Sequence, residues 1–308
     1  MAAILYNLLS SLGLVSLGLY HLVSAALSHL KSPHSYSAKP LHPFPPSSSS
    51  SPHHHRLRHL PLYVIILALV VAFIHQLFIS AETDPLVKGH TPVHRFISLQ
   101  FAAVIFLFII LAFCLLLSES SFLPFSNDFI FALASVLFFL QYSVATATAS
   151  VQVSDLEAKC DSVSARISAF AALTCLVLAF QPKLFAADVG LGAAIFLQGL
   201  WVFQTGLTLY VDAFIPDGCH RLLDVVDGVE GSTKCELEES KLRATAILDL
   251  IFLVHVMLVV FIVMIIHAGI SKCVGIRRFG SYDSLPNPSS HSENSSIIQM
   301  KALTGTQA

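Results

Sequence analysis

The stretch at residues 191–210, LGAAIFLQGLWVFQTGLTLY, decides the fold of this chain. It is apolar enough to lie in a bilayer, and it has the ~20 residues that a bilayer core requires. Gly192, Gly199 and Gly206 recur every seven residues, which keeps them near one helix face with a drift of about 20° per heptad. Missing side chains along that face let a neighbouring backbone approach closely. The pattern predicts a helix inside a membrane bundle.

Two amides flank the glycine face of this stretch. Gln198 and Gln204 lie on opposite sides of it, each roughly 100–120° away by helical periodicity. Amides within lipid need hydrogen-bond partners, because no water reaches them there. We therefore expect both side chains to bond to other helices of the bundle.

The composition of the whole chain agrees with a membrane protein. Of its 308 residues, 55% are hydrophobic and 12% are charged, and the formal net charge is −2. Soluble domains carry about 25% charged residues. The basic residues are few and scattered near the ends of apolar segments, so the sequence gives no case for nucleic-acid binding.

Hydropathy predicts an all-α fold, a polytopic bundle of seven transmembrane helices. Residues 1–30 form the first helix, residues 31–60 a disordered cytosolic loop rich in Ser, Pro and His, and residues 271–308 a disordered cytosolic tail. Residues 61–270 hold six further helices and an acidic extracytoplasmic loop at 212–243. The first segment is retained rather than cleaved, because it lacks a basic leader and exceeds the usual apolar core of a signal peptide. The expected spans are 4–30, 62–80, 94–117, 127–150, 163–181, 186–211 and 244–270.

Basic clusters at the span ends suggest an orientation. Lys and Arg divide almost evenly between the two faces, but Arg56/Arg58 and Lys272/Arg277/Arg278 adjoin span ends without compensating acids. Positive residues favour the cytosolic face. We expect an extracytoplasmic N-terminus and a cytosolic C-terminus.

The loop at 212–243 carries two cysteines, Cys219 and Cys235. An oxidising lumen would allow them to pair, and Cys160 on the same face could replace either partner. The acidic side chains of the loop match no EF-hand spacing, so solvation explains them better than calcium does.

The motif LQG-W-FQ-G--LY, followed by residues 215–219 (IPDGC), resembles the transmembrane protein 45 family, especially its plant branch of unknown function. The resemblance runs from residue 14 to about residue 272. It implies a non-enzymatic scaffold or trafficking role at Golgi, endosomal or plasma membranes, and a link to stress or defence responses. It places the core family motif at Gln198, Gly199, Trp201, Phe203, Gln204 and Gly206, and the loop cysteine at Cys219.

This chain departs from the family at the end of the fourth span. Plant relatives carry histidines there, whereas residues 141–146 read QYSVAT and residues 155–160 read DLEAKC. The resemblance therefore transfers no catalytic or metal-binding residue to this chain.

Ionisable groups inside the spans are the default candidates for function. The main ones are His75, Asp249 and His255. Haem ligation would need two histidines at one depth, and only His75 and His94 meet that requirement. Transport would need a polar path around the sixth and seventh helices, yet no internal repeat or broken helix is apparent. We expect these groups to be packing and hydrogen-bond partners.

Signatures of soluble enzymes are missing: the chain has no G-x-S-x-G, H-E-x-x-H, P-loop or C-x-x-C motif. We expect no enzyme activity and no cofactor, although an intramembrane enzyme or a seven-span receptor would also lack these motifs. The histidines at residues 53–55 suggest a solvated loop rather than a metal site.

The partners suggested by the sequence are the lipid bilayer, other membrane proteins and vesicle adaptors. Tyr282 and Leu285 in the tail fit a Tyr-x-x-apolar sorting signal, which binds adaptors in an extended conformation.

Overall fold

Seven long helices make up most of the part of the chain that the computed structural model describes, residues 2–42, 59–81, 87–88, 91–120, 122–123, 125–152, 154–223 and 230–279. The helices are α1 (Ala2–Lys31), α3 (Leu60–Ala81), α4 (Val93–Glu119), α5 (Asn127–Val151), α6 (Asp155–Phe180), α7 (Phe185–Tyr210) and α8 (Glu238–Phe279). Within the described residues, each contains a window long and apolar enough to cross a membrane. The predicted fold class, an all-α bundle of seven helices, is confirmed.

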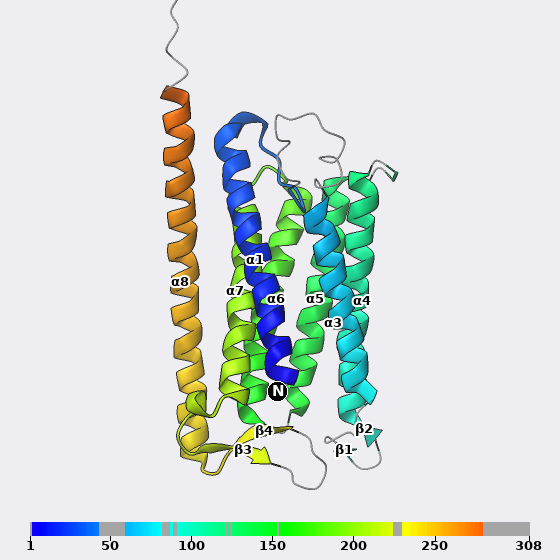
Figure 1. Ribbon diagram of the computed structural model, residues 1–308, viewed down its shortest axis with the longest axis vertical. Helices are drawn as coiled ribbons and strands as arrows, with labels where there is room; N and C mark the ends of the chain where they lie inside the picture. Colours follow the sequence, from blue (N-terminus) through cyan, green and yellow to red (C-terminus); the bar gives the residue numbers. More distant parts are fainter. Residues whose placement is uncertain are drawn as a thin grey trace, which may run out of the picture. The chain divides into compact units, whose positions relative to one another are not determined.

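The described parts of the connections contain short elements. They are η1 (Pro33–Ser35), η2 (Asp212–Phe214), and two antiparallel hairpins, β1 (Val87–Lys88) with β2 (Thr91–Pro92) and β3 (Cys219–Leu223) with β4 (Glu230–Cys235). Figure 1 shows both hairpins at the end of the bundle where α1 begins.

The helices pack in the order α3, α4, α5, α6, α7, α1, each against the next. Leu17 and Tyr20 of α1 also pack against a cluster that contains Leu62 of α3 and Ala112 of α4, so this cluster links the two ends of the order. Helix α8 contacts the bundle through a few side chains, including Leu248 and Val259. Most of its remaining apolar side chains are exposed, as expected for a helix with a face toward lipid.

The glycine face of α7 packs against α1, as its seven-residue spacing predicts. A Cβ atom at Gly199 would lie 2.7 Å from the backbone nitrogen of Val15, and one at Gly206 would lie 3.0 Å from Cβ of Asn7. From the other side, a Cβ at Gly18 of α1 would lie 2.5 Å from the backbone nitrogen of Phe196. These distances leave no room for a side chain. Glycine at these positions therefore allows the backbones of α1 and α7 to pack closely.

Helix α6 begins at Asp155, eight residues before the start of the predicted span. Ser154 caps it by accepting a hydrogen bond from the amide of Glu157, and Asp155 and Glu157 add negative charge to the first turn. Ser154 also donates to the carbonyl of Thr233 in β4, at 2.5 Å. The extra turns are therefore capped and held beneath the β3–β4 hairpin.

The prediction of a disordered loop at 31–60 is wrong for residues 32–42. In this segment Tyr36, Ala38, Leu41 and His42 are buried, and the amide of Ala38 donates to the carbonyl of Pro182 at 2.7 Å. A composition rich in Ser, Pro and His concealed a segment whose few large side chains pack into the bundle. Residues 43–58, which include the three histidines at 53–55, lie outside the described residues.

Candidate functional site

A buried cluster of His21, Tyr36 and Asp188 joins three parts of the chain at one end of the bundle. Asp188 lies in the first turn of α7 and is fully buried. One carboxylate oxygen lies 2.8 Å from Nε2 of His21 in α1. The other accepts a hydrogen bond from the hydroxyl of Tyr36, at 2.5 Å. Because both oxygens have partners, the carboxylate is well solvated by the protein despite its burial.

His42 lies next to this cluster. Its ring centroid is 6.0 Å from that of His21, and its Nδ1 atom is 3.4 Å from the hydroxyl of Ser28. Tyr20 donates a hydrogen bond to the backbone carbonyl of His42. Nε2 of His42 is buried and has no hydrogen-bond partner. The same holds for Nδ1 of His29, another histidine at this end of the bundle.

His29 and Tyr36 belong to an aromatic group that covers the cluster. The His29 ring stacks on Phe185 with centroids 4.1 Å apart, and it meets the edge of Tyr36 at 5.2 Å. Phe185 also contacts Tyr36, at 5.8 Å. Residues 32–42 are thus attached to α1 and α7 by rings as well as by hydrogen bonds.

Burial controls the protonation of Tyr36 and His42, the two buried ionisable groups in the segment at 32–42. It raises the pKa of Tyr36, and the hydrogen bond and negative charge of Asp188 raise it further, so the phenol stays protonated and donates. Burial lowers the pKa of His42 to about 4, and the nearby His21 adds to that effect. At neutral pH His42 is therefore an uncharged imidazole.

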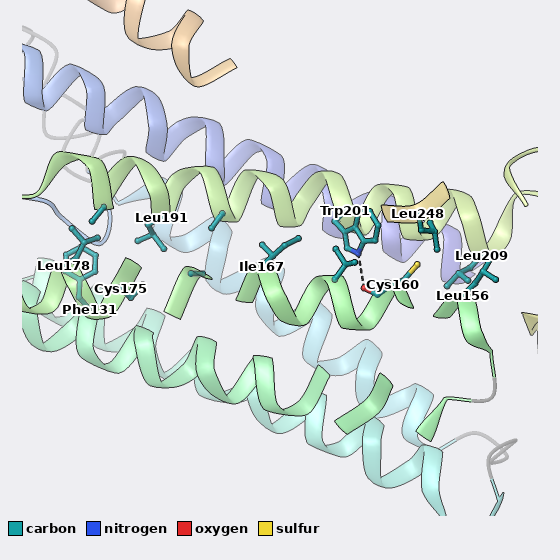
Figure 2. Close-up of a cluster of buried hydrophobic side chains, with 14 of the residues drawn as sticks. Phe131, Leu156, Cys160, Ile167, Cys175, Leu178, Leu191, Trp201, Leu209 and Leu248 are labelled. Carbon is teal, nitrogen blue, oxygen red and sulfur yellow. Dashed lines mark hydrogen bonds between the residues drawn. The ribbon is translucent and has the colours of Figure 1, made fainter. Parts of the chain in front are cut away.

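The core family motif lies in a separate, mainly apolar part of the bundle. Trp201 is almost fully buried, and its indole nitrogen donates to the carbonyl of Cys160 in α6 at 3.0 Å (Figure 2). Gln198 Nε2 donates to the hydroxyl of Ser164, also in α6, at 2.6 Å. Gln198 Oε1 is buried without a partner. The expectation that Gln198 bonds to another helix is therefore met through its nitrogen alone.

The other members of the motif have different roles. Gln204 donates to Thr208 of its own helix at 3.0 Å, so the expectation of a partner on another helix is not met by this bond. An amide can bond four residues along a helix, which satisfies it locally. Phe203 is partly exposed, whereas Gly199 and Gly206 contact α1.

The predicted intramembrane groups are not brought together. His75 stacks on Tyr6 with ring centroids 4.0 Å apart. Asp249 is half exposed and pairs with Lys159, Nζ to Oδ2 2.6 Å. His255 is half-buried: its Nδ1 lies 2.8 Å from the carbonyl of Ile251, and its ring meets Trp201 edge-on at 6.3 Å. The side chain of His94 and the tail residues Tyr282 and Leu285 lie outside the described residues.

Cys219 and Cys235 form a disulfide with an S–S distance of 2.03 Å. They are directly opposite each other in the β3–β4 hairpin, which places the bridge between the end of α7 and the start of α8. Cys160 is a free, buried thiol in α6.

The described residues contain no group of three or more His, Cys, Asp or Glu side chains that could hold a metal ion. The His21–Asp188–Tyr36 cluster is a chain of hydrogen bonds rather than a ring of donors around a common point. It can hold residues 32–42 against the bundle. Sequence reasoning did not select Asp188, because an acid in the first turn of a span also serves as an ordinary helix-end residue.

No curated protein matches this chain. The comparison with protein families gives one match, which begins with α5 and ends within α8. It includes the core motif, Asp188 and the disulfide, but not α1 or residues 32–42. Residues 127–268 match the model of a family of unknown function, DUF716, the family also called transmembrane protein 45-like.

Proposed function

We propose that this multi-pass membrane protein is a non-enzymatic scaffold that takes part in membrane trafficking. The observation that supports a scaffold is the pairing of polar groups in the core: Gln198 bonds to Ser164, and Trp201 bonds to Cys160. Groups that line an aqueous path need water, whereas these groups bond helix to helix within a cluster of buried apolar side chains. Such pairing favours a permanent packing role.

The single tryptophan provides the test. We expect Trp201 fluorescence in purified protein to resist quenching by aqueous iodide and acrylamide, because the indole is 1% exposed. The control moves the tryptophan to an exposed site by combining Trp201→Phe with Phe214→Trp, since Phe214 is 54% exposed. Quenching of the parent as strong as that of the control would indicate water at Trp201 and contradict the dry scaffold.

A transporter for a small solute or ion is the second candidate. The unpartnered, buried Oε1 atom of Gln198 supports it, because an acceptor of this kind suits a passing donor or cation. The test measures uptake of small solutes and ions into proteoliposomes. Uptake that is lost in Gln198→Leu and kept in Phe203→Leu would favour this candidate over the scaffold.

The trafficking part of the proposal rests on Tyr282 and Leu285 in the cytosolic tail. We expect Tyr282→Ala to shift a fluorescent fusion from endosomal membranes to the cell surface, because adaptors take the tyrosine in a pocket. Asp283→Ala changes a position between the two contact residues and serves as the control. Equal distributions of parent and Tyr282→Ala would remove the sorting role.

The orientation, membrane and family branch complete the proposal. We propose an extracytoplasmic N-terminus, a cytosolic C-terminus, and residence in Golgi, endosomal or plasma membranes. Epitope tags at the two ends test the orientation: antibodies should reach the N-terminal tag in intact cells and the C-terminal tag only after permeabilisation. Placement of the whole chain in the plant branch, with a role in stress or defence, rests on the sequence resemblance between residues 14 and 272.

A further inference from the structure

We propose that residues 32–42 form a strap that closes one end of the bundle over the His21–Asp188 pair, and that protonation of His42 releases it. The strap is not part of any of the seven long helices, and its charged anchor is a single buried carboxylate, that of Asp188. A segment held in this way can detach while the helices stay packed.

Besides the ring contacts of Tyr36 with His29 and Phe185 and the hydrogen bond from Tyr20 to the carbonyl of His42, three anchors hold the strap. Tyr36 donates to Asp188, the amide of Ala38 donates to the carbonyl of Pro182, and Leu41 packs with Leu62 and Ala112. These anchors attach it to α7, to the turn between α6 and α7, and to α3 and α4. Detachment would open Asp188 and His21 to water from this end of the bundle.

His42 is the strap residue least suited to carry charge in the docked position. Its Nδ1 atom faces Ser28, and its Nε2 atom is buried without an acceptor. A second proton would therefore add a donor that has nothing to bond. Released into water, the same imidazolium would be fully solvated.

The charged and titratable groups around His42 come from four elements. Helix α1 contributes His21, α7 contributes Asp188, and the strap itself contributes Lys39 and Tyr36. On α6, Cys175 faces Asp188. Leu62 of α3 and Ala112 of α4 are apolar. His21 and Lys39 oppose a positive charge on His42, and Asp188 favours one but already accepts from His21 and Tyr36.

The direction of the pH effect follows from these contacts. Docking lowers the pKa of His42 from 6.5 to about 4, so protons bind the released strap more tightly than the docked one. The docked state is most stable above pH 6.5, and it loses stability as the pH falls from 6.5 toward 4.

Hydrogen exchange of the full-length protein in nanodiscs tests the switch at the amide of Ala38. After correction for intrinsic exchange, we expect protection of that amide to fall about 30-fold between pH 7.5 and pH 5. Amides in the middle of α6 should keep their protection over the same range. A strap that is equally protected at both pH values would overturn the proposal.

Three variants distinguish the proton sensor from the anchors. His42→Gln keeps a polar side chain but takes up no proton, so its strap protection should not change with pH. His34→Gln, an exposed histidine of the same strap, should respond like the parent. Tyr36→Phe should lower protection at both pH values and keep the pH response. Trp201 emission like that of the parent shows that a variant is folded, and His42→Asn replaces His42→Gln if the latter fails this check. If strap protection in the folded variant still falls with pH, the switch belongs to another group.

Discussion

Asp188 bonds to two side chains that come from different parts of the chain. Its two oxygens join α1 to the strap, through partners that are 167 and 152 positions away in the sequence. A buried carboxylate is costly unless it is paired and hydrogen-bonded. The contribution of Asp188 to stability therefore depends on His21 and Tyr36, which both bond to its carboxylate.

We expect Asp188→Asn to lower the free energy of unfolding by roughly 2–4 kcal/mol, because the amide offers one acceptor where the carboxylate offers two. Thermal unfolding in detergent, followed by Trp201 emission, measures the change. Asp128→Asn is the matched control, since Asp128 also lies in the first turn of a helix but is exposed. Equal melting of the two variants would show that the cluster contributes no more than a surface acid.

At the scale of elements, the contact between α1 and α7 depends on the missing side chains of α7. We expect Gly199→Leu to prevent stable accumulation of the protein, because its Cβ alone would lie 2.7 Å from the Val15 nitrogen. Gly13→Leu places the same side chain in α1 at a site with no atom within 4 Å, and it should be tolerated. Expression level and size-exclusion profile report both outcomes. A normal profile for Gly199→Leu would rule out the close contact of these helices.

The helices could be predicted from the sequence, whereas the site could not. Apolar length locates every span, and the heptad of glycines identifies the packed face of α7. The strap escaped prediction because its order comes from distant partners: Tyr36 packs against Phe185 and donates to Asp188, both in α7. The hydrophobic periodicity of a short stretch of sequence does not predict such a long-range contact. Likewise, the cap at Ser154 extends α6 through polar residues that hydropathy excludes.

At the scale of the whole molecule, the Cys219–Cys235 bridge connects the six packed helices to α8, which has few other contacts. The bridge spans 16 positions, and closing a loop of that length contributes about 3 kcal/mol in the chain-entropy model. We expect Cys219→Ser to lower the melting temperature and to abolish the effect of reductant on it. Cys114→Ser removes a free, half-buried thiol and should leave both unchanged. A reductant effect that survives in Cys219→Ser would assign the bridge to another pair.

The hydrogen bond between His21 and Asp188 joins residues that are synthesised at different times. The two residues are 167 positions apart, and ribosomes add roughly 5–20 residues per second, so α1 leaves the ribosome roughly 8–33 s before its partner exists. During that interval His21 of the first helix has no Asp188 to bond, and the glycines that contact this helix have not yet been made. The contacts of His21 with Asp188 and of Gly18 with Phe196 can therefore form only after the sixth span has been made.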